Sequence, residues 1–301
     1  MSKFFKILKM FNLYFTNTKK NIDIDWVEYN PELKSKSTVI PKKIWIYWDS
    51  DRPNCLVDLC IQRVRSVLFD FEIHVLNKDN ISNYLDLPDF NKELPLANIS
   101  DYIRLALLSK YGGIWMDASI FLNEDLKWIL SKIHGYDAFL FYSDECTIDL
   151  KNPISENWFI CAPENSGFIR DWFAEYSKCI LSDNPKEYYV NVDRVILQNL
   201  SKPNYLLPYV SAIMVLKQDK YPILYARSGS IGHYYNYKYQ WDGDLIAVDL
   251  LFKNSEQVTL PKLIKFNSSS RRGVERYLTK GLFNKKSLLG RYFVKKIGNL
   301  N

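Results

Sequence analysis

Residues 99–119 read ISDYIRLALLSKYGGIWMDAS. The mostly apolar run at 103–111 predicts a helix, and Ser100 is a suitable N-cap for it. Two glycines then end the helix, and residues 114–116 predict a short buried strand that stops at Asp117. A helix, a glycine turn and a strand in this order are typical of an α/β domain, with an acidic side chain just beyond the strand end.

The same alternation extends to both sides of this stretch. Strand-like residues at 43–48, a helical pattern at 56–68 and a second strand at 71–76 predict a β-α-β unit and therefore a mostly parallel sheet. Downstream, the pattern predicts strands at 138–142 and 158–162 and helices at 167–181 and 190–200.

Composition is compatible with one such domain. The chain has 301 residues, of which 47% are hydrophobic and 25% charged, and no linker-like segment divides it. We expect an N-terminal basic and apolar extension at 1–36, the α/β domain at 37–270 and a basic tail at 271–301. A dinucleotide-dependent oxidoreductase is disfavoured because no Gly-x-Gly-x-x-Gly follows the first strand.

Ligands of open α/β sheets collect at the carboxyl ends of the strands. Two predicted strand ends carry suitable side chains, namely Trp48 with Asp49 and Asp117 with Ser119. An acid in such a place holds a ribose hydroxyl or a divalent metal.

Several motifs together resemble one family. Residues 99–105 and 110–119 are similar to the sugar-binding region of glycosyltransferase family 32 and of bacterial capsular polysaccharide synthesis proteins. The resemblance continues at 41–48 and at 156–162 and, more loosely, at His233 with Trp241 and at 261–266. The resemblance implies a GT-A (Rossmann-like) fold and a retaining transferase that uses a nucleoside diphosphate sugar and a saccharide acceptor, in bacterial capsule or surface polysaccharide synthesis.

The resemblance also implies a donor site. Asp101 and Arg104 would hold hydroxyls of the donor sugar, Trp115 would line the sugar pocket, Trp48 would lie by the base, and Asp117 would be the first acid of an Asp-x-Asp motif. The catalytic residues expected are Asp101, Arg104 and Asp117. The donor-binding residues expected are Tyr47, Trp48, Asp101, Arg104, Trp115, Asp117, Ser119, His233 and Trp241.

A divalent metal, Mn²⁺ or Mg²⁺, is the cofactor that the resemblance implies. Its candidate ligands are Asp117, His233, Asp242 and Asp244. Ser119 stands where the motif has its second acid, and a hydroxyl is a weak ligand beside a carboxylate, so the sequence leaves metal coordination open.

Each functional interpretation has a structural alternative. Asp101 and Arg104 are three residues apart and would contribute only a few tenths of a kcal/mol as a simple helix ion pair. Asp242 and Asp244 would suit a surface turn. The missing second acid also leaves open a catalytically inactive protein that binds nucleotide-sugars or serves as a membrane scaffold.

The two ends of the chain concentrate its net charge of +6. Lysines interrupt an aromatic segment before residue 16, and the tail carries Arg271, Arg272, Arg276, Lys280, Lys285, Lys286, Arg291, Lys295 and Lys296. Basic and aromatic residues together suit an anionic lipid surface, so we expect a cytoplasmic protein bound peripherally to the inner face of the plasma membrane and a lipid-linked acceptor. The chain has five cysteines without a Cys-x-x-Cys pair, which favours free thiols in a reducing compartment. The sequence contains no nucleic-acid recognition fold, so we expect no nucleic acid as a partner.

Overall fold

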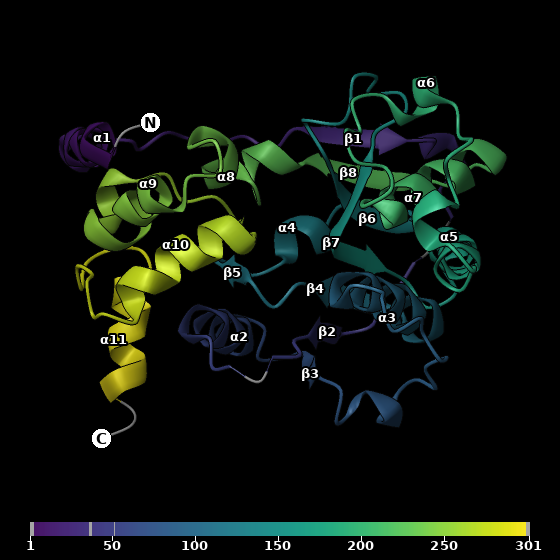
Figure 1. The fold of residues 1–301 in the computed structure, drawn as a ribbon, viewed down its shortest axis with the longest axis horizontal. Coiled ribbons are helices and arrows are strands. Elements are labelled where there is room, and N and C mark those ends of the chain that lie inside the picture. The colour runs from purple at the N-terminus through teal and green to yellow at the C-terminus, as the bar shows by residue number, and fades with distance from the viewer. Residues whose placement is uncertain (1–2, 36–37, 51, 299–301) are drawn as a thin grey trace.

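The computed structural model describes residues 3–35, 38–50 and 52–298. A seven-stranded sheet lies at its centre (Figure 1). In order across the sheet the strands are β1 (Trp26–Tyr29), β8 (Ile223–Arg227), β6 (Ala138–Tyr142), β7 (Ser155–Ala162), β4 (Gly113–Met116), β2 (Lys43–Tyr47) and β3 (Glu72–Leu76). Only β1 and β7 run antiparallel to their neighbours, so five of the seven strands share one direction. The predicted α/β fold with a mostly parallel sheet is confirmed.

Helices cover both faces of this sheet, and further helices extend the molecule beyond one end of the sheet (Figure 1). They are α1 (Lys3–Phe15), α2 (Cys55–Val67), α3 (Leu96–Tyr111), α4 (Lys127–Leu130), α5 (Gly167–Ile180), α6 (Arg194–Leu197), α7 (Leu207–Gln218), α8 (Tyr234–Lys238), α9 (Gly243–Ala247), α10 (Ser268–Leu278) and α11 (Gly290–Gly298). One hydrophobic cluster joins α3, α5 and α7 to the sheet, and a second joins α2 and α4 to the opposite face. All eight residues of β7 are buried because both faces are covered.

Two glycines set the turn between α3 and β4. Gly112 and Gly113 have φ of +58° and +95°, conformations that residues with a side chain rarely adopt. A Cβ on Gly112 would lie 2.5 Å from the backbone nitrogen of Glu164, and one on Gly113 would lie 2.7 Å from the carbonyl oxygen of Lys43. The turn therefore needs glycine for its conformation and for the close approach of two neighbouring segments.

Two helix boundaries differ from the expectation. Helix α3 begins at Leu96, directly after Pro95, so Ser100 lies inside the helix and caps nothing at its N-terminus. Pro95 is the N-cap residue, with an extended backbone (φ −60°, ψ 140°) and no side-chain cap hydrogen bond. The helix predicted at 190–200 is reduced to the single turn of α6.

A smaller sheet and the last helices form the end of the molecule opposite α5 and α7 (Figure 1). Strand β5 (Ile120–Leu122) pairs antiparallel with β9 (Leu263–Lys265). Helices α8 to α10 pack with α2 in a third hydrophobic cluster that buries Val274 and Leu278 of α10, together with Leu288 and Leu289. The expected boundary at 270/271 falls inside α10. The segment after it packs into the body through its apolar side chains, while Lys280, Lys285 and Lys286 are exposed; the side chains of Lys295 and Lys296 lie outside the described residues.

Candidate functional site

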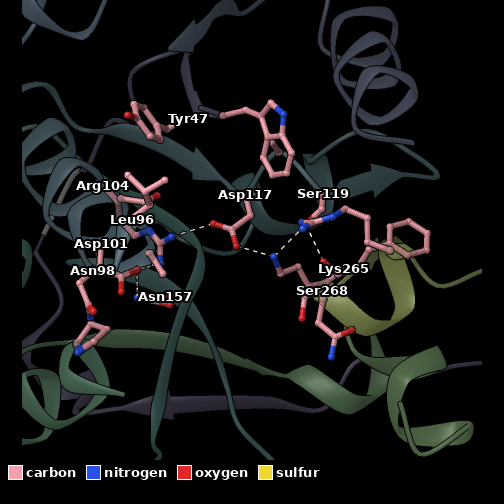
Figure 2. A pocket seen from close by; sticks show the side chains of 18 of the residues that line it. Tyr47, Leu96, Asn98, Asp101, Arg104, Asp117, Ser119, Asn157, Lys265 and Ser268 are labelled. Atoms are coloured by element: carbon pink, nitrogen blue, oxygen red, sulfur yellow. Dashed lines mark hydrogen bonds and ion pairs between the residues drawn. The ribbon is translucent and has the colours of Figure 1, made fainter. Parts of the chain in front are cut away.

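A cavity of about 350 Å³ opens at the carboxyl ends of β2 and β4 (Figure 2). These two strands are parallel neighbours, so the residues that follow them meet at one edge of the sheet. The lining comes from the β2 end (Tyr47, Trp48, Asp49), from α3 (Asp101, Arg104), from the β4 end (Asp117, Ser119), from β7 (Asn157) and from the segment 265–271. A volume of this size is at the lower end of the range for small-molecule sites.

Arg104 connects the two predicted carboxylates. Its guanidinium nitrogens lie 3.0 Å from Asp101 Oδ1 and 2.9 Å from Asp117 Oδ1, and its plane lies over the ring of Trp115. Arg104 is only 4% exposed, so these charge-assisted contacts are made largely out of water. The alternative of a simple exposed helix pair does not fit this geometry.

Lys265 provides a second cation for Asp117. Its Nζ lies 2.5 Å from Asp117 Oδ2 and 3.2 Å from Ser119 Oγ. Figure 2 draws interactions between these residues as dashed lines. The pairing of β9 with β5 sets Lys265 opposite Ile120 and so brings it beside the β4 end. Asp117 thus lies between two cations, one on each oxygen.

The electrostatics of the two acids differ. Burial alone would raise the pKa of Asp117, but the adjacent cations Lys265 and Arg104 outweigh burial and hold that pKa below its ordinary value. Asp101 is partly buried, and this burial with the nearby charge of Asp117 raises its pKa to about 6 in spite of Arg104 and a hydrogen bond from Asn157. At neutral pH both are carboxylates, and Asp101 is the one that titrates on mild acidification.

The opposite wall of the cavity is basic and aromatic. Arg271, in the first turn of α10, stacks its guanidinium over the ring of Trp48 at 4.9 Å. The N-terminus of α10 lies at the same wall, since Asn267 and Ser268 line the cavity, and Asn267 caps the helix. A helix N-terminus and an arginine both favour an anionic ligand group.

The sequence profile described as "Capsular polysaccharide synthesis protein" matches residues 8–224, more than two thirds of the chain. The chain belongs to this family. Within the family match lie the β2 end, α3, the β4 end and Asn157, whereas Lys265 and Arg271 lie beyond it.

This chain is only distantly similar to individual relatives. It is 28% identical over 159 residues to the O-glycosyltransferase braB of Annulohypoxylon truncatum, an alignment that covers 46% of this chain and 37% of that protein. Among solved structures it is similar to the glycosyltransferase GlyE of Streptococcus pneumoniae TIGR4 (13% identity, TM-score 0.42, 86% of this chain and 64% of that one). It is also similar to the galactosyltransferase LgtC (12% identity, TM-score 0.40, 80% and 96%).

Three aromatic residues of the predicted donor site lie behind or beside the cavity in this family member. Trp115 is fully buried and acts on the site through Asp117, to which its indole nitrogen donates a hydrogen bond of 3.0 Å. His233 is buried against Asn236, and burial with the nearby Lys265 lowers its pKa to about 3, so it is neutral. Trp241 donates instead to Glu145 at 3.2 Å. Neither His233 nor Trp241 lines the cavity.

The predicted metal ligands are not brought together. Asp242 caps α9 and pairs with Lys6, while Asp244 pairs with Lys6 and Arg276. The described ranges hold no group of three or more His, Cys, Asp or Glu side chains arranged to bind a metal ion. The proposed ligand set therefore does not fit Mn²⁺ or Mg²⁺, because its members have cationic partners or lie apart.

Several cavity residues were not predicted from the sequence, among them Lys265, Arg271 and Asn157. Asn157 and Lys265 lie in segments that resemble the family, but neither segment marks a ligand by residue type alone. Arg271 belongs to the segment expected to form a basic tail. The one sequence signal for Lys265 is that this cation follows two apolar residues of a short strand-like segment.

Proposed function

We propose that this protein is a glycosyltransferase that moves a sugar from a nucleoside diphosphate sugar to a hydroxyl of a saccharide acceptor. The observation that carries the proposal is the cavity in which Arg104 joins Asp101 to Asp117 at two parallel strand ends. Fixed carboxylates and an arginine fork are well suited to hydroxyl groups of a sugar, and membership of the capsular polysaccharide synthesis family supports the same activity.

The cavity offers a place for each part of such a donor. Asp101 and Asn157, from α3 and β7, form the polar wall for sugar hydroxyls. The diphosphate would lie between Lys265 and Arg271, where the α10 N-terminus adds its dipole. Trp48, held by Arg271, supplies an aromatic face for the base.

We further propose that transfer occurs with retention of configuration. Both Asp117 oxygens already accept hydrogen bonds from cations, which favours a charge-organising role for Asp117 over nucleophilic attack. In the transfer, the bond from the anomeric carbon to the phosphate oxygen breaks and leaves its electron pair on the phosphate. The anomeric carbon then bonds to the acceptor oxygen, whose proton passes to the leaving diphosphate. Capsule or surface polysaccharide synthesis in a bacterium, with a lipid-linked acceptor, is the setting we propose.

A donor panel tests the activity. Purified protein is incubated with UDP-, GDP-, CDP- and ADP-sugars, and release of the nucleotide is followed with and without saccharide acceptors. We expect one donor class to be consumed, and Asp117→Asn to reduce the rate at least about a hundredfold. Asp79→Asn, at an exposed loop position, serves as the control and keeps full activity. Consumption of none of the donors, together with tight binding of one of them, would instead support the inactive binding protein.

For the location we propose attachment to an anionic membrane through α1. Its aromatic side chains point outward, with Phe4, Phe11 and Phe15 exposed by 72%, 61% and 70%. An apolar groove between α1 and residues 277–284 continues this surface, and the exposed Lys280, Lys285 and Lys286 lie in or next to that segment. The described residues contain no helix long and apolar enough to cross a bilayer. An amphipathic helix with nearby cations is the usual design for binding in the plane of the interface.

Some of the basic residues expected to bind the membrane have other partners in the structure. Arg271 faces the cavity and Arg276 pairs with Asp244, so these two of the nine cations expected on the membrane are engaged elsewhere. We therefore expect the double change Phe4→Ser and Phe11→Ser to abolish sedimentation with vesicles rich in anionic lipid. Phe69→Ser, at a residue that is 86% exposed after α2, should leave it unchanged. Equal sedimentation of all three proteins would refute attachment through α1.

A further inference from the structure

The ammonium group of Lys265 lies where the motif of a metal-dependent donor site would hold its cation. It is within 2.5 Å of the first acid, Asp117, and within 3.2 Å of Ser119, the residue in the place of the second acid. The side chain of Lys265 is only 11% exposed, so its charge is directed into the site and little screened by water.

Ser119 is poorly placed to bind a metal ion. Its hydroxyl donates a hydrogen bond of 2.7 Å to the carbonyl oxygen of Phe266 and accepts one from Lys265, and the residue is 3% exposed. Asp117 receives Arg104 and Trp115 on one oxygen and Lys265 on the other. A divalent ion at Asp117 would have to displace Lys265 or lie against both Lys265 and Arg104, and Coulomb repulsion opposes the second arrangement.

The backbone holds Lys265 in place from both sides. Its amide donates to the carbonyl of Gly232 at 2.8 Å, and its own carbonyl accepts from Asn236 at 2.8 Å. The next amide, that of Phe266, donates to the carbonyl of Ser119 at 2.9 Å. This anchoring keeps the ammonium group at the β4 end before any ligand arrives, which is the condition for electrostatic stabilisation without reorganisation.

We propose that Lys265 takes the role of the divalent cation, so that this protein binds and uses its nucleoside diphosphate sugar without a metal. The inference rests on the proposed function. Lys265 would donate hydrogen bonds to the diphosphate and neutralise the negative charge left on the phosphate oxygen when its bond to the anomeric carbon breaks. A lysine is an effective point charge for phosphate, and here Asp117 orients it.

Binding of nucleoside diphosphates tests this without relying on turnover. Chelator-treated protein is titrated with UDP, GDP, CDP and ADP by calorimetry, in EDTA and in Mn²⁺. We expect one nucleotide to bind with the same affinity, within about twofold, in both conditions. Binding that occurs only with Mn²⁺ would overturn the metal-free role while leaving the proposed function intact. Failure of every nucleotide and every nucleotide-sugar to bind in either condition would instead count against the proposed function itself.

Variants assign the effect to the ammonium group. Lys265→Met removes the charge and keeps the length of the side chain, and it should weaken binding of the diphosphate about a hundredfold. Lys265→Arg keeps the charge and should retain most of the affinity. Lys262→Met, on the same segment and paired with Glu124, is the matched control with unchanged affinity. Equal affinity of Lys265→Met and Lys262→Met for the diphosphate, with cooperative melting of both proteins, would exclude contact of Lys265 with the ligand.

A double variant gives a gain of function. Ser119→Asp with Lys265→Ala supplies the second acid and removes the cation, and it should acquire Mn²⁺ binding detectable by electron paramagnetic resonance, with nucleotide affinity restored only by the metal. Wild-type protein should show no Mn²⁺ signal from this site. Specific Mn²⁺ binding by the wild type that Lys265→Met leaves unchanged and Asp117→Asn removes would contradict the inference.

Discussion

Arg104 is buried and also lines the cavity, so its substitutions separate an effect on stability from the proposed contact with the donor. Because it is buried between two carboxylates, Arg104→Ala should lower the free energy of unfolding by about 3–5 kcal/mol. This corrects the expectation for an exposed helix pair, which would lose only a few tenths. Arg104→Lys keeps the charge but not the planar fork, so we expect a smaller loss of stability and a raised KM for the donor.

Thermal melting and donor kinetics of both variants measure these effects. Arg170→Ala, which breaks an exposed pair with Asp171, is the control and should change stability by less than about 1 kcal/mol. An Arg104→Ala protein with unchanged melting would show that the buried ion pair contributes nothing net.

The raised pKa of Asp101 predicts a pH dependence. With a pKa of about 6, Asp101 loses its charge as the pH falls through 6, and donor affinity should fall with it, whereas Asp117 remains ionised. The same titration affects the stability of the fold in the opposite direction. The folded value lies above the unfolded value of about 4, so the contribution of this group to stability is present below about pH 4 and is lost as the pH rises to about 6.

A pH series of donor affinity for the wild type and for Asp101→Asn checks this. The wild type should lose affinity below about pH 6, and the variant should show a lower but flat profile over the same range. A step of equal size in both proteins would assign the titration to another group.

At the scale of elements, the turn between α3 and β4 determines where Asp117 lies. Gly112→Ala combines a positive φ with a contact of 2.5 Å to Glu164, so it should lower the free energy of unfolding by about 1–3 kcal/mol or more and reduce activity by moving the β4 end. Gly281 also has a positive φ, +66°, but meets nothing within 4 Å. Denaturant unfolding of Gly112→Ala and Gly281→Ala therefore separates close packing from backbone strain, and equal losses would leave strain alone as the cause.

At the scale of the whole molecule, the two ends of the chain are not equivalent. Removal of residues 271–301 should unfold the protein, because Val274, Leu278, Leu288 and Leu289 are buried in the cluster with α2 and each contributes on the order of 1.5–3 kcal/mol. Removal of residues 1–15 should leave a cooperative transition, since most of α1 is exposed. Circular dichroism during heating distinguishes the two deletions. A shortened chain ending at 270 that melts cooperatively would show that the last helices are a separable tail after all.

The local sequence pattern was sufficient to predict much of the fold around the cavity. The β-α-β unit, the glycine turn and the positions of Asp101, Arg104 and Asp117 relative to helix and strand follow from periodicity and from turn chemistry within about 20 residues. The resemblance of the same segments to one family agreed with the family match. Side chains that follow neighbouring parallel strands must meet at one edge, so the sequence determined where a site would lie.

Only the tertiary structure decided which charges meet there. Lys265 is 148 residues from Asp117, and it reaches that carboxylate through the pairing of β9 with β5. Asp242 and Asp244 instead meet Lys6, and His233 is buried without charge. The physical reason is that ion pairs depend on distances of a few ångströms between remote segments, which are set by strand register and helix packing and leave no periodic trace in the sequence.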